Sequence, residues 1–333
     1  MKIRVVPAQP HCFAFGGFDI QMHRTLEVLT AMGVDARPLD FWSRDGDFDI
    51  VHFWGFDTDQ HLTAARFAKR YGKKIVLTPL LQYLTPRSWL RYAGALVEGT
   101  ARRRIALGRL VDKFLAVNEE QGETLRQMYR VPASKIEIIP TILDDRFFEA
   151  QPVRTALADG FADFMLCAGN ICARKNQLSL ARAAIDTRTP LLFAGDVSGG
   201  EEAYGEEFAR LIAPHGFLRW NRWMDGPQLL EAYGASRGVV LPSYEEQQPT
   251  IGLEAAALGK PLMLGRLPYA RQKFYRGAFL ADPASVREIA EGLKALTATP
   301  GRHIPSREIV EECRADRVGP KLKRIFEELL SAS

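Results

Sequence analysis

Short apolar runs rich in β-branched residues alternate along the chain with longer segments whose apolar residues recur at helical spacing. The runs cover residues 3–6, 50–53, 75–78, 114–117 and 136–139, and then 164–169, 191–195, 238–242, 261–265 and 278–281. Continuous apolar strands that alternate with helices are typical of parallel sheets covered on both faces. The pattern therefore predicts an α/β protein with two Rossmann-like, doubly wound parallel-sheet domains.

The alternation lapses across residues 144–163, a polar stretch interrupted by Pro152 and Gly160. We place the domain boundary there, with an N-terminal domain at residues 1–150 and a C-terminal domain at 151–315. We assign residues 316–333, which carry the pattern of an amphipathic helix, to the first domain. Ligands of such sheets collect beyond the carboxyl ends of the strands, so two facing sheets predict a cleft between domains.

The strongest chemical signal is SYEEQQPTIGLEAAALGKP at residues 243–261, in which seven residues separate Glu246 from Glu254. Start and stop signals predict a short helix that contains Glu254 and follows a loop that contains Glu246. The unpaired amides at the start of that helix would suit a diphosphate, and the two carboxylates would reach sugar and ribose hydroxyls. The alternative is that one glutamate favours the helix dipole and the other is solvated.

Two further turns follow predicted strands. In CAGNICARKNQ, Lys175 comes just before a helix, where a cation is favoured if an anion lies between it and the helix dipole. By itself Lys175 also fits an ordinary surface lysine. Gly16 and Gly17 follow the first strand and would let the backbone approach a phosphate or a sugar, although ordinary turns use glycine pairs as well.

Together these motifs resemble glycosyltransferase family 4, also called glycosyl transferases group 1, over nearly the whole chain and most densely at residues 164–262. The carrying residues are the two glutamates, the Ala-Ala-Ala-Leu-Gly-Lys-Pro run after them, the glycine pair, Gly169 and Lys175. In that family the first acid contacts the transferred sugar and the second contacts the ribose.

The resemblance implies the GT-B fold and a metal-independent, retaining enzyme. Such an enzyme would move a hexose from a UDP- or GDP-sugar to a glycan or lipid-linked acceptor in cell-envelope polysaccharide synthesis. The resemblance assigns catalytic roles to Lys175 and Glu246. The resemblance also assigns donor binding to Gly16, Gly17, Gly169, Asn170, Arg174, Thr250, Ile251 and Glu254.

The chain departs from the family pattern at several positions. Asn170 stands in place of an arginine, for which Arg174 is a candidate substitute, and Leu80 stands in place of a frequent histidine near the acceptor. Residues 141–142 replace Asn-Gly, and residues 247–249 replace Gly-Phe-Gly. Three alternatives therefore stay open: an epimerase or a phosphorylase on the same scaffold, and a catalytically silent subunit that binds sugar nucleotides.

The residues predict neither a metal nor a cofactor. Asp47-Phe48-Asp49 matches the metal-binding DxD of the other major glycosyltransferase fold, but Asp49 opens a strand here. Helix amides and Lys175 can neutralise the leaving group instead.

Charge is concentrated in one part of the chain. The net charge of +4 gives no reason to expect nucleic acid, but residues 60–113 hold twelve Lys or Arg against two acids. Within this segment arginines alternate with apolar residues, which suits an interfacial helix on anionic lipid. The residues concerned are Arg87, Arg91, Arg102, Arg103 and Arg104. The alternative is a solvated face whose apolar residues turn to the core.

Scattered cysteines and the absence of a long apolar run predict a reduced, cytoplasmic protein. Any membrane contact would then be peripheral, on the inner face.

Overall fold

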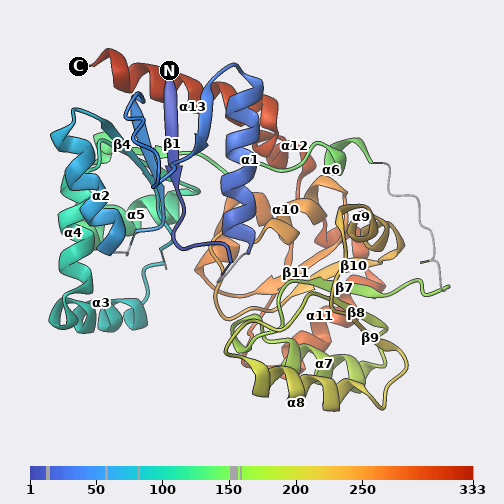
Figure 1. The fold of residues 1–333 in the computed structure, drawn as a ribbon. Helices are drawn as coiled ribbons and strands as arrows, with labels where there is room; N and C mark the ends of the chain where they lie inside the picture. Colours follow the sequence, from blue (N-terminus) through green and yellow to red (C-terminus); the bar gives the residue numbers. More distant parts are fainter. Residues whose placement is uncertain (13–15, 57–58, 82, 151–156, 158–159, 333) are drawn as a thin grey trace. The chain divides into compact units, whose positions relative to one another are not determined.

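The computed structural model describes residues 1–12, 16–56, 59–81, 83–150, 157 and 160–332 of the chain, drawn in Figure 1. Contacts divide it into two compact units, Met1–Ile142 with Glu312–Ser333, and Leu143–Glu311. Residues 143–150, which we expected in the first domain, therefore belong to the second unit.

Each unit contains a six-stranded parallel sheet. The first consists of β1 (Lys2–Val6), β2 (Asp35–Pro38), β3 (Ile50–Trp54), β4 (Lys74–Thr78), β5 (Lys113–Ala116) and β6 (Ile136–Ile138), in the order β2-β1-β3-β4-β5-β6. The second consists of β7 (Met165–Ala168), β8 (Leu191–Ala194), β9 (Leu218–Asn221), β10 (Gly238–Leu241), β11 (Leu262–Gly265) and β12 (Phe279–Ala281), in the order β12-β11-β10-β7-β8-β9. The strand order reverses direction between β1 and β3 in the first sheet, and between β7 and β10 in the second. Ligands of open parallel sheets bind at such switch points.

Helices connect the strands. In the first unit they are α1 (Gly17–Ala31), α2 (Asp59–Arg70), α3 (Pro86–Glu98), α4 (Thr100–Leu110), α5 (Glu119–Tyr129) and α13 (Ala315–Ser331). In the second unit they are α6 (Arg146–Glu149), α7 (Gln177–Thr187), α8 (Glu202–Ile212), α9 (Gly226–Ala235), α10 (Thr250–Ala257), α11 (Val286–Ala298) and α12 (Arg307–Val310). The α/β class with doubly wound sheets is confirmed.

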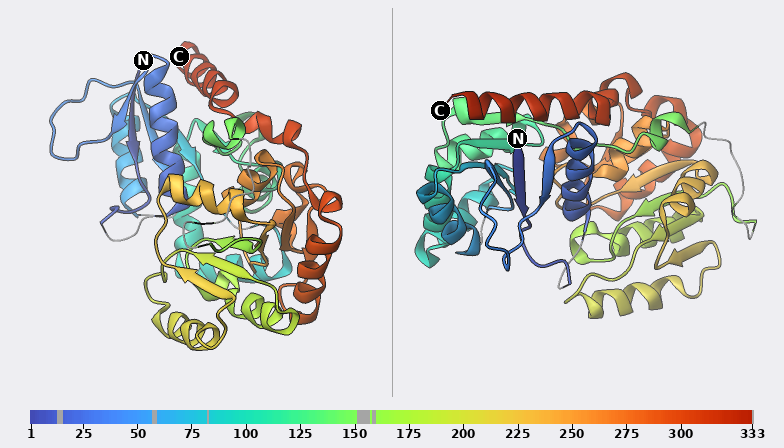
Figure 2. Two further views of the ribbon diagram at one scale, coloured as in Figure 1. Left: turned by 90° about the vertical axis from the view of Figure 1, so that its right-hand side faces the viewer. Right: turned by 45° about the horizontal axis from the view of Figure 1, so that its top comes forward.

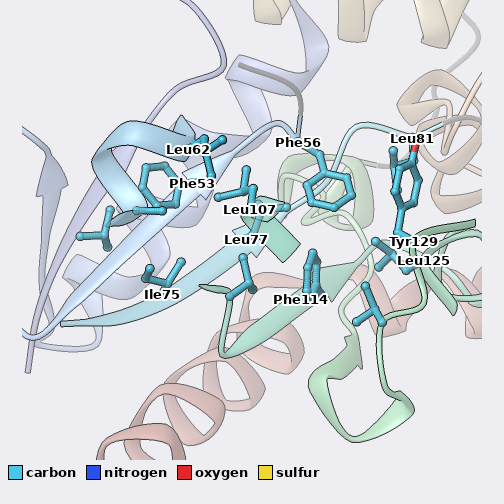
Figure 3. Packing of buried hydrophobic residues seen from close by; sticks show 14 of the residues in the cluster. Phe53, Phe56, Leu62, Ile75, Leu77, Leu81, Leu107, Phe114, Leu125 and Tyr129 are labelled. Atoms are coloured by element: carbon cyan, nitrogen blue, oxygen red, sulfur yellow. The ribbon is translucent and has the colours of Figure 1, made fainter. Parts of the chain in front are cut away.

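The first sheet is covered on both faces. Neighbouring side chains of a strand point in opposite directions, so each strand contributes residues to two cores. Val6 belongs to a core that β3, β4 and β5 form with α2, α4 and α5, and Figure 3 shows Phe53, Leu77 and Phe114 in it. Val5 belongs to the opposite core, against α1 and α13. Strands buried on both faces explain why their sequences read as unbroken apolar runs.

The helix α13 returns to the first unit and packs beside α1 (Figure 2). It buries Val318, Leu322 and Phe326 in the core below α1. Gly319 lets the two helices approach closely, since a Cβ there would lie 2.7 Å from the Cγ1 atom of Val28. In the second unit, α7, α8 and α11 lie on one side of the sheet, and α9 and α10 on the other (Figure 1).

Two strands are absent from our predictions. We predicted neither β2 nor β9. Both strands lie at the edge of their sheet and are largely exposed or half-buried, with the sequences DARP and LRWN. An edge strand does not need an apolar run, and these two have none, so the criterion that finds central strands misses them. The other two edge strands, β6 and β12, are mostly apolar and were predicted.

Candidate functional site

The switch point of the second sheet brings together the two residues to which we assigned catalysis. Lys175 ends a short 3-10 turn, Ala173–Lys175, after β7, and Glu246 lies in the loop after β10. The Lys175 Nζ atom donates a hydrogen bond to Glu246 Oε1 at 2.9 Å. Both side chains are mostly buried, with 15% and 10% of their surfaces exposed. A buried ion pair thus occupies the place where this sheet type binds ligands.

Glu246 has two more partners, and both contact the same oxygen. The Arg174 Nη1 atom lies 3.3 Å from Glu246 Oε1, and the Ser243 hydroxyl donates to it at 3.0 Å. Burial alone would raise the pKa of Glu246, but the charges of Lys175 and Arg174 and the hydrogen bonds from Lys175 and Ser243 hold that pKa below its usual value. The carboxylate is therefore ionised at neutral pH.

Backbone geometry around the pair fixes the lysine. Gly169, at the end of β7, has φ +140°, and a Cβ on it would lie 3.1 Å from three atoms of the Lys175 side chain. Asn176 takes a left-handed conformation at φ 63°, and its buried amide donates to the carbonyls of Pro242 and Pro283 at 3.1 and 2.7 Å. The turn is thereby tied to the end of β10, which leads to Glu246.

The helix α10 begins beside these residues without a side-chain cap. Its N-cap is Pro249, and within the described residues no hydrogen bond is made by the backbone amides of Thr250 or Ile251. Of its eight residues, all are buried except Thr250 and Glu254, which lie one turn apart and so share a face. Free amides at the positive end of a helix favour an anion.

A buried pair of glutamine side chains holds the loop that departs from the family pattern. Gln248 donates through Nε2 to Gln272 Oε1 at 3.0 Å, and Gln272 donates through Nε2 to the Gln247 carbonyl at 2.6 Å. The Gln-Gln-Pro sequence that replaces Gly-Phe-Gly is thus held by hydrogen bonds to the segment after β11. These bonds stabilise the path from Glu246 to α10.

The remaining donor-binding candidates fall in both units. Asn170 is exposed, and its carbonyl accepts from the Gln177 side chain at 2.9 Å. Gly16 and Gly17 stand at the start of α1, where the Gly16 amide donates to Asp19 Oδ2 at 2.9 Å. This glycine pair follows β1, at the switch point of the first sheet.

Sequence reasoning missed several side chains that shape the site. They are Ser243, Asn176 and Gln272, together with Tyr233 of α9, which bonds to Glu254. Ser243 stands three residues before Glu246, so proximity in sequence was the available signal. Nothing in the sequence links Tyr233 or Gln272 to the loop, because tertiary folding alone brings them there.

The basic segment forms two helices rather than one. Gly99, with φ 88°, separates α3 from α4. In α4, Arg103 pairs with Asp59 at 2.9 Å and Arg104 donates to the Tyr129 hydroxyl at 2.8 Å, so these two arginines contact their own unit. Both arginines are half-buried, and their assignment to the membrane or acceptor side stays a prediction.

The helix α3 differs from α4 in its exposure. Trp89, Leu90 and Val97 are 43%, 75% and 84% exposed, and Arg91 is exposed beside them. Arg102, just beyond, is exposed too, whereas the side chain of Arg87 lies outside the described part of the structure.

The DxD segment has protein partners. Asp49 accepts a hydrogen bond from the Lys2 amide at 2.7 Å, and Asp47 pairs with the Lys2 side chain. Across the described residues, no group of three or more His, Cys, Asp or Glu side chains is placed to hold a metal ion. None of the helices described has the length and apolar character needed to cross a membrane.

Two family profiles match the chain. The one described as Glycosyltransferase Family 4 matches residues 16–147, and the one described as Glycosyl transferases group 1 matches residues 162–299. A D-inositol 3-phosphate glycosyltransferase from Nocardiopsis dassonvillei is 26% identical over 80% of this chain. The match covers 64% of that relative, so the chain spans less than two thirds of its length.

Two solved structures share the fold. HepE from Anabaena, in complex with UDP and glucose, gives a TM-score of 0.76 at 15% identity, over 98% of this chain and 99% of that one. A sucrose-phosphate synthase from Thermosynechococcus elongatus gives 0.79 at 15% identity, over 100% of both chains.

Proposed function

Because this chain belongs to glycosyltransferase family 4 and has the GT-B fold, we propose that it transfers a hexose from a UDP- or GDP-sugar to a glycan or lipid-linked acceptor, with retention at the anomeric carbon. The reaction would serve cell-envelope glycan synthesis. The observation that carries the proposal is the buried Lys175–Glu246 pair at the switch point, beside the uncapped start of α10.

The contacts of the pair suggest a division of roles. Lys175 carries three N–H donors, of which one meets Glu246, so the others can bind a phosphate oxygen together with the amides of Thr250 and Ile251. The three contacts that the described residues make to the Glu246 carboxylate all go to Oε1. Its Oε2 atom is then available to accept hydrogen bonds from the sugar hydroxyls.

Front-face attack fits these roles. The acceptor oxygen bonds to the anomeric carbon on the face from which the diphosphate leaves, and its proton passes to the departing phosphate oxygen. Lys175 and the α10 amides stabilise the charge that develops on that diphosphate. No step requires a metal, so we expect turnover to be unaffected by EDTA.

The test is sugar transfer by the purified chain. UDP- and GDP-hexoses are supplied with glycan, lipid-linked and inositol phosphate acceptors, the last chosen because of the name of the Nocardiopsis relative. The anomeric configuration of the product is read by NMR. Loss of the oxyanion donor Lys175 as Lys175→Met should lower kcat by roughly 10²–10³. Lys294→Met, at an exposed lysine of α11, is the matched control. Neither transfer nor donor hydrolysis with any donor would refute the proposal.

We propose further that the enzyme meets a lipid-linked acceptor by binding, through α3, to the cytoplasmic face of an anionic membrane. Support comes from the exposed Trp89, Leu90 and Val97 beside Arg91. Inserting a leucine-sized side chain contributes about 1.5–3 kcal/mol, and each arginine near anionic lipid about 1 kcal/mol.

Flotation with phosphatidylserine vesicles tests the membrane proposal. Leu90→Glu should abolish flotation, whereas Trp42→Ala should not, although Trp42 is 95% exposed in the same unit. Equal loss of flotation in both variants, or no flotation of the wild type at low salt, would exclude α3 as the docking helix.

A further inference from the structure

Glu254 is the one charged side chain through which α10 can reach a ligand. Six of the eight residues of this helix are buried, and the two others are Thr250 and Glu254. Since Glu254 stands one turn inside the helix, its carboxylate lies on the same face as the free amide of Thr250. A nucleotide whose diphosphate meets the amides would therefore bring its ribose toward Glu254.

A second residue, which is buried, restrains the Glu254 carboxylate. Tyr233 of α9 donates its hydroxyl to Glu254 Oε2 at 2.5 Å, and the hydroxyl also lies 3.4 Å from the Ile251 carbonyl. The tyrosine is fully buried, with its ring edge-on to Phe147 of α6 at a centroid distance of 5.7 Å. A buried ring that is packed in this way holds its hydroxyl at a fixed point.

In the hydrogen bond between Tyr233 and Glu254, the tyrosine is the donor. Burial and the neighbouring Glu254 carboxylate raise the pKa of Tyr233 well above its ordinary value, so the hydroxyl keeps its proton. A protonated phenol facing an ionised carboxylate can only donate to it. The Tyr233 hydroxyl therefore holds Oε2 of Glu254, whose side chain is half-buried.

We propose that Tyr233 is a positioning residue, which holds Glu254 Oε2 and so orients this carboxylate for the ribose hydroxyls of the nucleotide. This inference rests on the proposed function. A glutamate carboxylate, on three rotatable bonds, loses rotamer freedom when it binds a ligand, and a hydrogen bond made beforehand removes that cost from the binding step. Tyr233 would thus favour ribonucleotides without touching the nucleotide.

The test compares nucleotides that differ only in the ribose. UDP and GDP, and their 2′,3′-dideoxy counterparts, are titrated calorimetrically into the wild type and Tyr233→Phe, which removes one oxygen from a packed ring. We expect the wild type to prefer each ribonucleotide. In Tyr233→Phe that preference should fall about tenfold, with dideoxy binding unchanged, because a hydrogen bond to a charged group contributes about that much. The donor KM should rise by a similar factor, and kcat should stay within about twofold.

Tyr275→Phe is the matched control. Tyr275 is also fully buried, and its hydroxyl donates to the Pro249 carbonyl at 3.1 Å, at the same end of α10. It should lose a comparable amount of stability while keeping the ribose preference of the wild type.

The outcomes separate this inference from the proposed function. If Tyr233→Phe keeps the wild-type preference, or weakens ribo and dideoxy binding equally, Tyr233 is merely structural and the inference is overturned while the enzyme assignment stands. If the wild type binds neither nucleotide, both fail together.

Discussion

Acidification should destabilise this protein through the buried histidine His52. His52, in the middle of β3, is fully buried, and its Nε2 atom lies 2.8 Å from the Thr78 hydroxyl. Its Nδ1 atom has no hydrogen-bond partner among the described residues. The rings of Trp54 and Phe326 lie 5.4 and 5.9 Å away, centroid to centroid. Because burial opposes the charged form, the pKa of His52 is lowered from 6.5 to about 3.

The sign and size of the effect follow from linkage. Below pH 6.5 the unfolded chain takes up a proton at His52, whereas the folded chain stays neutral until about pH 3. The stability contributed by the neutral imidazole is therefore complete above pH 6.5 and is lost as the pH falls toward 3. Each pH unit in this window costs about 1.4 kcal/mol, so the whole window costs about 5 kcal/mol and the step from pH 6.5 to 4.5 about 2.7 kcal/mol.

Urea unfolding followed by tryptophan fluorescence measures this contribution. His52→Gln should lose about 1 kcal/mol at pH 7 and then gain on the wild type as the pH falls, so the two stability curves cross near pH 5.5–6. Thr78→Val removes the hydrogen bond but keeps the imidazole, and its curve should run parallel to that of the wild type. Parallel curves for His52→Gln and the wild type between pH 6.5 and 4.5 would refute the reasoning.

Two further predictions concern packing and charge in the second unit. Lys175→Met or Glu246→Gln alone should lower the free energy of unfolding by about 3 kcal/mol, because each change leaves the other member of the pair buried without its ion-pair partner. The double variant should recover most of that loss without recovering activity, and additive losses in chemical denaturation would contradict the pairing. Gly292→Ala should cost about 1–3 kcal/mol by overpacking, because a Cβ there overlaps the Met263 sulfur. Gly301→Ala meets open space and should leave the melting temperature unchanged; equal shifts would count against the packing argument.

The central strands and the two-sheet class were predictable because a strand that is buried on both faces requires an unbroken run of apolar residues. The edge strand β2, with the sequence DARP, has no such constraint and gave no signal. The unit boundary was displaced for a related reason. The short helix α6 buries Phe147 and Phe148 in the second unit, and a four-residue helix shows no period.

The residues of the site likewise differ in how far the sequence predicts them. Lys175 and Glu246 could be found because each follows a strand in a recognisable local context, and parallel topology brings such turns to one sheet edge. Tyr233 and Gln272 reach the site from elements far along the chain. Their role depends on a distance between side chains, which no local pattern in the sequence encodes.

The return of α13 to the first unit means that only one of the two units is a continuous piece of polypeptide. Residues 143–311 form one continuous segment, whereas a fragment ending at residue 142 would expose to water the apolar side chains of α1 and of the sheet that α13 covers. During synthesis, the N-terminal unit must wait for α13 to emerge from the ribosome before it can close its second core. Fragment studies of the first unit should therefore join residues 1–142 to 312–332 through a short linker rather than truncate the chain.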